Sequence, residues 1–149
     1  MPRDRYVVQV EAAIYRAGRY LLIQRSLEES HAPGTLALPG GKVEAALADE
    51  PLLIVEHTLR REVREEVGLE VQALAYIYSS FFESDDGDPC VALTFLASVE
   101  AGEPSISDPA EVAGFVWVSA ADIETFATLP PWTRQALRYA DQARRQMGW

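Results

Sequence analysis

The chain has 149 residues, of which 48% are apolar and 24% charged, a balance typical of a soluble globular protein. This length predicts one domain, residues 1–149, with a single substantial hydrophobic core. The formal net charge of −10 argues against a surface for polymeric nucleic acid, which needs a basic stripe, but not against a small phosphorylated ligand.

The sequence also bears on the compartment of the protein. Its apolar runs fall far short of a membrane span, and its first residues lack the apolar core of a secretory signal. Cys90 is the only cysteine, so no disulfide can form within the chain. These features predict a cytoplasmic protein with no membrane partner. The oligomeric state stays open, and a homodimer is one option.

The first part of the chain predicts strands that are separated by turns and loops. The expected elements are strands over Tyr6–Tyr15, Tyr20–Gln24 and Thr35–Leu38, a turn at residues 16–19, and a loop over Ser26–Gly34. The glycine pair Gly40 and Gly41 is expected to form a turn after the third strand.

The next segment predicts an amphipathic helix. Asp49 is suited to cap the N-terminus of this helix, with Pro51 in the first turn. Apolar residues then recur at steps of three and four, which gives the helix one buried face. These residues are Leu52, Val55, Leu59, Val63 and Val67. Gly68 is expected to end the helix at about Val67.

The remaining elements are mostly strands, followed by a terminal helix. They are strands over Val71–Phe82, Cys90–Val99 and Phe115–Val118, a turn at residues 85–88, a loop over Gly102–Ala113, and a helix over about Trp132–Gln146. Ser119, with Asp122 three residues later, predicts the start of a short helix before the last one. Strands on both sides of one central helix predict an α/β sandwich around a mixed sheet.

Three glutamates near the end of the central helix carry the strongest functional signal. At about 100° per residue, Glu62, Glu65 and Glu66 spread over about 100° of one helix face. Like charges at this spacing repel each other and destabilise the helix, and a hard divalent cation removes the repulsion. An acidic helix face exposed to water is the alternative interpretation.

The residues around these glutamates favour the metal site. The segment RREVREEVGL resembles the second half of the Nudix box, the signature of hydrolases that cleave nucleoside diphosphates linked to another group. The fixed positions of that half are matched by Arg61, Glu62, Val63, Glu65, Glu66, Gly68 and Leu69. The segment LPGGKVE, at residues 38–44, resembles the usual start of the box.

The first half of the box departs from the family pattern. From Gly41 to Arg61 the chain has twenty steps where the pattern has fourteen, so six residues are inserted. The first glutamate of the pattern falls on Leu47 when counted from Gly41, or on Leu53 when counted from Arg61, and leucine cannot bind a metal. Either Glu50 or Glu56 can supply the missing carboxylate, and the spacing does not choose between them.

The resemblance implies the Nudix fold, an α/β/α sandwich around a mixed β-sheet. It also implies hydrolysis of the diphosphate linkage in a nucleoside di- or triphosphate derivative, with Mg²⁺ or Mn²⁺ as the cofactor. Such a linkage resists attack because its oxygens are negative, so catalysis needs charge neutralisation, a positioned water and a base.

The resemblance assigns roles to individual residues as well. Glu62, Glu65 and Glu66 are expected to bind the metal, and the backbone at Gly40 and Gly41 to add a carbonyl ligand. Arg61 is expected to orient the glutamates. Glu111, in the loop before Trp117, is a candidate for a further ligand or the base, with Asp108 as a weaker rival. Arg25 and Lys42 are candidates to bind substrate phosphates, although each also fits an ordinary surface charge.

Three functions remain in competition at this point. One is a nucleoside triphosphate pyrophosphatase of the MutT type, and another is a pyrophosphatase for nucleoside diphosphate sugars. The third is a nucleotide-sensing module that binds without cleaving. Such modules commonly lose box glutamates, so the presence of Glu62, Glu65 and Glu66 argues against it.

Overall fold

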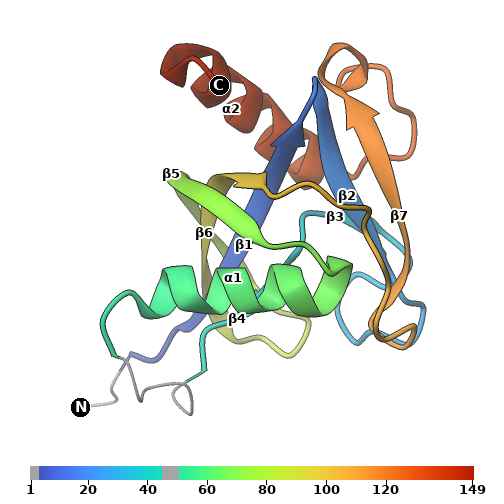
Figure 1. Cartoon of the computed structure of the whole chain (residues 1–149). Coiled ribbons are helices and arrows are strands. Elements are labelled where there is room, and N and C mark those ends of the chain that lie inside the picture. Colours follow the sequence, from blue (N-terminus) through green and yellow to red (C-terminus); the bar gives the residue numbers. More distant parts are fainter. Residues whose placement is uncertain (1–3, 45–50) are drawn as a thin grey trace.

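A mixed β-sheet with a long helix on each side forms the structure (Figure 1). The computed structural model describes residues 4–44 and 51–149. The strands are β1 (Val7–Arg16), β2 (Arg19–Arg25), β3 (Leu36–Ala37), β4 (Gly40–Lys42), β5 (Val71–Glu83), β6 (Pro89–Val99) and β7 (Val112–Ser119). The helices are α1 (Ile54–Val67), η2 (Ala120–Asp122, a 3-10 helix) and α2 (Pro131–Met147). This architecture confirms the predicted α/β sandwich around a mixed sheet.

β1 organises the sheet because it pairs with three other strands. It runs parallel to β6 and antiparallel to both β2 and β4. β2 pairs with β1 only from Ile14 onward, and β4 occupies the same edge of β1 between Gln9 and Glu11. The predicted turn at Gly40 and Gly41 is therefore wrong. These glycines form a strand because the free backbone groups of β1 need partners there.

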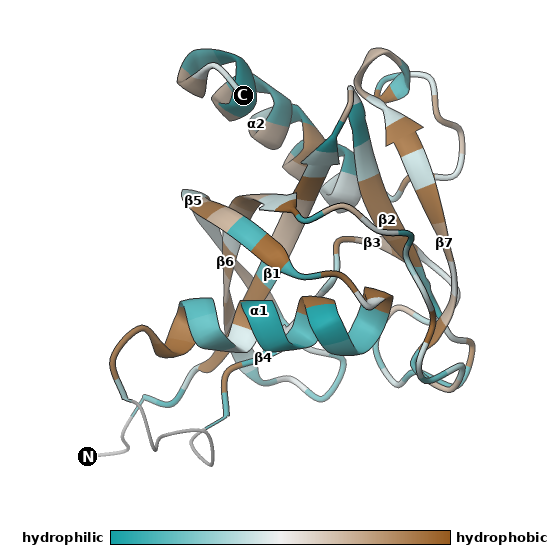
Figure 2. Ribbon diagram, in the orientation of Figure 1, coloured by the Kyte–Doolittle hydropathy of each residue, from teal (hydrophilic) through white to brown (hydrophobic). Residues whose placement is uncertain are grey.

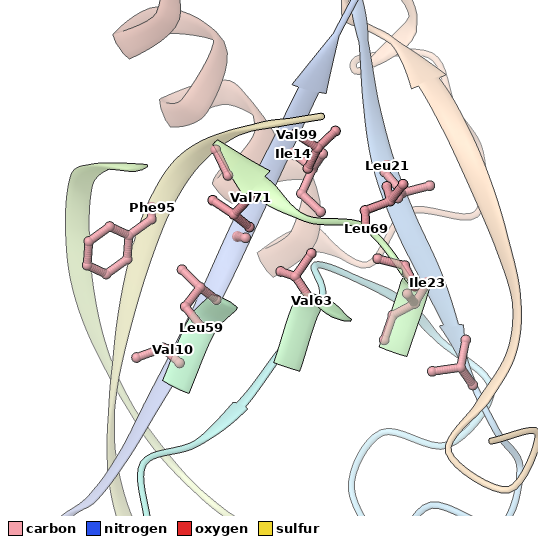
Figure 3. Packing of buried hydrophobic residues seen from close by; sticks show 14 residues of the cluster. Val10, Ile14, Leu21, Ile23, Leu59, Val63, Leu69, Val71, Phe95 and Val99 are labelled. Atoms are coloured by element: carbon pink, nitrogen blue, oxygen red, sulfur yellow. The ribbon is translucent and has the colours of Figure 1, made fainter. Parts of the chain in front are cut away.

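Alternating side chains of β1 and β2 divide the core into two clusters. One side of the sheet packs against Leu59, Val63 and Val67 of α1 (Figure 3). The other side packs against Ala136, Leu137 and Ala140 of α2. Successive side chains of a strand point to opposite faces, which explains the continuous apolar runs of both strands. The outward side of α1 is largely hydrophilic (Figure 2).

α1 begins at Ile54, later than the start predicted at Asp49. Leu53, the residue before the helix, has a φ of 59°, a left-handed conformation that an α-helix cannot contain. Asp49 itself lies outside the described residues. Leu52 was predicted for the buried face but is 80% exposed, because it precedes this change of direction. The end of the helix is as predicted, since Gly68 adopts a φ of 68°.

The C-terminal elements agree closely with those predicted from the sequence, apart from the start of β7. β7 begins at Val112 rather than Phe115, because Val112 pairs with Arg25 across an irregularity in the β2 register. Ser119 caps η2 as predicted, by accepting a hydrogen bond from the backbone N–H of Ala121. Within residues 4–44 and 51–149, no helix has the length and apolar character needed to cross a membrane.

The contact between β4 and β1 yields a first prediction. A Cβ atom on Gly40 would overlap the carbonyl oxygen of Val10 and lie 2.8 Å from the Cα atom of Glu11. Both are backbone atoms of the central strand, which cannot yield without losing sheet hydrogen bonds. We expect Gly40→Ala to lower the free energy of unfolding by more than about 2 kcal/mol, as measured by urea denaturation.

The matched control is Gly114→Ala in β7. A Cβ atom there would meet only the side-chain oxygen of Gln24, at 3.8 Å. This substitution should change the free energy of unfolding by less than about 1 kcal/mol. Equal stability losses in the two variants would show that the close approach at Gly40 is unimportant.

Candidate active site

The glycine strand β4 and the second half of α1 meet at the candidate active site. The backbone N–H of Gly40 donates a hydrogen bond to Oε1 of Glu66, with a distance of 2.9 Å. A Cβ atom on Gly41 would lie 2.5 Å from Cδ of Glu62, so the missing side chain leaves the space that this carboxylate occupies. Two segments far apart in the sequence are thus joined by direct contacts.

The three box glutamates lie in different environments. Glu66 is only 7% exposed, whereas the side chain of Glu62 is 17% exposed and that of Glu65 is 54% exposed. Nη2 of Arg61 donates to Oε1 of Glu62 at 3.0 Å, and Nη1 lies 3.9 Å from Oε1 of Glu65. Arg61 therefore lies where it can orient two of the three carboxylates.

Burial dominates the electrostatics of the two inner glutamates. It raises the pKa of Glu66 to about 8, against the effect of the Gly40 N–H, and the negative charge of Glu62 adds to the increase. Burial likewise raises the pKa of Glu62 to about 7, although Arg61 opposes the change. Ionising both groups is therefore costly while no cation lies beside them.

Glu111 reaches the same electrostatic neighbourhood from a distant part of the chain. It precedes β7, and its carbonyl oxygen accepts a hydrogen bond from the N–H of Ser26 at 3.0 Å. The charge of Glu111 raises the pKa of both Glu62 and Glu66. Its own pKa is raised by burial and by the neighbouring charge of Asp108. The β2–β7 pairing thus brings Glu111 towards the box glutamates.

The two predicted phosphate ligands are placed differently. Arg25 lies at the end of β2, and its charge lowers the pKa of both Glu66 and Glu111. Its guanidinium group is already engaged, since Nε donates to the carbonyl oxygen of His31 at 2.9 Å and Nη2 contacts Glu29 at 3.3 Å. Lys42 is exposed at the end of β4, next to Gly41.

Of the two candidates for the missing box glutamate, only Glu56 lies within the described residues. Glu56 precedes Glu62 by six residues, a rotation of about 240° and a rise of about 9 Å along the helix. It therefore lies on another face of α1, and Glu50 lies outside the described residues. Glu44 was not predicted from the sequence as a site residue, although its charge raises the pKa of Glu62. Its position two residues after Lys42 is the signal that could have revealed it.

The three box glutamates are the candidate ligands for a metal ion. Among the described residues, no three His, Cys, Asp or Glu side chains form a group that could hold a metal as they stand. Glu62 and Glu66 contact β4, whereas Glu65 faces Arg61. The donor chemistry nevertheless fits a hard divalent cation, which prefers oxygen ligands. Glu62 and Glu66 offer carboxylate oxygens, and burial makes their negative charges costly unless a cation compensates them.

Comparison with known proteins identifies the family. The family model of the NUDIX domain matches residues 5–140 of the chain. This chain belongs to the Nudix family. The box residues are thus part of a match that extends over most of the chain, and the Nudix fold expected from them is confirmed.

Individual relatives agree with this identification. The nucleoside triphosphatase NudI of Klebsiella pneumoniae (strain 342) is 29% identical over 122 residues, which cover 76% of this chain and 82% of the relative. A MutT Nudix hydrolase from Burkholderia pseudomallei is 31% identical, with a TM-score of 0.75 over 91% of this chain and 98% of that one. A MutT protein from Methanosarcina mazei Go1 is 26% identical, with a TM-score of 0.76 over 97% and 99% of the two chains.

The protein is therefore a MutT-like Nudix hydrolase, an enzyme of the pyrophosphohydrolase type. Enzymes of this family act on small nucleotide substrates and generally use divalent metal ions.

The raised carboxyl pKa values predict how the stability of the metal-free Nudix protein depends on pH. The ordinary pKa of a glutamate is 4.5, and that of Glu66 is about 8 in the folded state. Between these values the folded protein binds more protons than the unfolded chain, so its stability falls as the pH rises. We expect the urea midpoint, measured with chelator, to fall from about pH 5 to about pH 8.

The variant Glu66→Gln should reduce this dependence, because an amide does not titrate and can still accept the Gly40 hydrogen bond. Glu56→Gln, on another face of the same helix, is the matched control and should retain it. A midpoint that rises over this pH range, or an equal slope in Glu66→Gln, would contradict the electrostatic account.

Proposed function

We propose that the protein hydrolyses the diphosphate linkage of a nucleoside triphosphate in a reaction that depends on Mg²⁺ or Mn²⁺. The products are a nucleoside monophosphate and pyrophosphate. The observation that best supports this proposal is the contact of two box glutamates with β4, in which Glu66 accepts from Gly40 and Glu62 packs against Gly41. These contacts hold the carboxylates of Glu62 and Glu66 beside the backbone of β4.

The residues that would hold the cation are Glu62, Glu65 and Glu66, together with the carbonyl oxygen of Gly40. When bound, a divalent cation supplies neutralisation of the phosphate oxygens and lowers the pKa of a coordinated water. Arg61 orients Glu62 and Glu65 through the contacts at 3.0 and 3.9 Å. The side chain of Glu65 is the most exposed of the three, so it can turn towards an incoming ligand at little cost.

Glu111 and Arg25 complete the proposed site. Glu111 acts as a further ligand or as the base, because its carboxylate lies close enough to raise the pKa of both inner glutamates. A carboxyl group with a raised pKa is better matched to accepting a proton near neutral pH. Positive charge for the substrate phosphates comes from Arg25, whose charge lowers the pKa of Glu66 and Glu111, and from Lys42 at the exposed end of β4.

One relative favours a triphosphate substrate. NudI is named a nucleoside triphosphatase, and 82% of its length matches this chain. A nucleoside diphosphate sugar and binding without cleavage are the competing functions. The three intact box glutamates support hydrolysis over simple binding, because a binding module does not need a cluster that is so costly to ionise.

Substitution of the glutamates tests the catalytic proposal. We expect Glu65→Gln and Glu66→Gln to lower kcat by at least about 100-fold, because each removes a charged metal ligand. Turnover is measured as released pyrophosphate or phosphate over a nucleotide panel with Mg²⁺. The melting temperatures in chelator should be unchanged or raised, which separates catalysis from folding.

The matched control is Glu70→Gln, which removes an exposed carboxylate that pairs with Arg64 outside the site. It should keep the turnover of the unmodified protein. Near-normal turnover in Glu65→Gln or Glu66→Gln at saturating substrate would refute the assignment of the box glutamates.

Nucleotide binding with and without metal separates hydrolysis from simple sensing. If the glutamates bridge a cation to the phosphates, chelator should weaken the binding of a non-hydrolysable triphosphate by at least about 10-fold, or about 1.4 kcal/mol. Isothermal titration calorimetry measures both affinities. Equal affinity in chelator would make the nucleotide-binding module the better description.

A further inference from the structure

β5 is a free edge of the sheet and is long for such a position (Figure 1). It spans 13 residues and, in the described part of the chain, pairs only with β6. Proteins usually protect edge strands by making them short or by placing charges and prolines on them. Between Val71 and Phe82, β5 has no charged residue and no proline.

One part of this edge is suited to pairing with another strand. The register with β6 is irregular between Val71 and Ala73 and again between Tyr76 and Tyr78. Such irregularities bend a strand and hinder pairing along its outer edge. From Tyr78 to Glu83 the register is uninterrupted, so this segment offers a regular row of backbone donors and acceptors.

Exposed apolar side chains lie beside this edge. Tyr76 and Phe81 of β5 are 53% and 62% exposed. On α2, Tyr139 is 45% exposed. The ring of Tyr139 lies 5.0 Å from that of Tyr78, which connects this side of α2 to β5. Aromatic side chains are typical of the centre of a protein–protein interface.

We propose that two copies of this chain associate through β5, with the two β5 strands antiparallel, so that their sheets join into one. A two-fold axis places the same surface on both copies, and the uncharged edge lets two chains of net charge −10 approach each other. This proposal does not depend on the proposed function, because the candidate active site is built on β4 and α1.

The charges at the two ends of β5 favour the antiparallel arrangement. Two arginines lie near Val71: Arg60 donates a hydrogen bond to the Val71 carbonyl oxygen, and Arg64 pairs with Glu70. The backbone N–H of Glu100 also donates to the carbonyl oxygen of Glu70. The other end is more acidic, with Glu83, Asp85, Asp86 and Asp88. Antiparallel pairing over Tyr78–Glu83 directs this acidic end towards the arginines of the second copy, whereas parallel pairing brings the two acidic ends together.

Sedimentation velocity of the full chain at micromolar concentration tests the proposal directly, and a species of twice the chain mass is expected. Ser80→Lys places a lysine on the exposed edge of each copy, and the two charges repel each other across the symmetry axis. We expect this variant to raise the dissociation constant of the dimer at least about 100-fold. Ala127→Lys adds the same charge in the exposed loop before α2 and should leave the dimer unchanged.

A second variant protects the test against misfolding. Phe81→Ser removes a largely exposed ring, so it should fold normally, as judged by circular dichroism and thermal midpoint, and still weaken the dimer. If Ser80→Lys does not fold, Phe81→Ser decides. A chain that stays monomeric throughout the micromolar range overturns the proposal, as does a dimer that folded edge variants leave intact. An increase of KM in these variants with unchanged mass would assign the surface to the substrate and overturn it equally.

Discussion

The close approach of β4 to β1 is the constraint on which the candidate active site depends. Gly40 lies against the backbone of β1, and Gly41 lies against the carboxylate of Glu62. A side chain at Gly40 would move β4 outward, and Glu66 would then lose its hydrogen bond from the Gly40 N–H. A side chain at Gly41 would displace the carboxylate of Glu62. Two residues without side chains therefore permit both the pairing of β4 with β1 and the observed positions of the Glu62 and Glu66 carboxylates.

This Nudix site is assembled against an electrostatic cost. Burial raises the pKa of Glu62 and Glu66, so the metal-free enzyme holds groups that resist ionisation at neutral pH. The apolar clusters on the two sides of the sheet stabilise the fold and offset the free-energy cost of these buried carboxylates. A site of this kind binds cations more weakly as the pH falls, because protons compete for the same oxygens.

The sequence by itself determined the features whose signals are local. β1 and β2 were predicted from their apolar residues. These strands are rich in apolar residues because helices cover both faces of the sheet. Gly68 ends α1 as expected, since glycine adopts the left-handed conformation readily. α2 was predicted to within one residue at each end from a proline break and a helical period. The box glutamates and Arg61 were recognised as a group because one helix carries all of them.

Only the tertiary structure decided the features that depend on distant partners. The strand at Gly40 and Gly41 exists because β1 leaves part of its edge free, and no local preference of glycine predicts it. The late start of α1 follows from the left-handed Leu53, which the apolar period does not encode. Glu111 approaches the box through the pairing of β2 with β7. Sequence periodicity reports the neighbours of a residue along one element, whereas charge clusters and strand edges arise from contacts between elements.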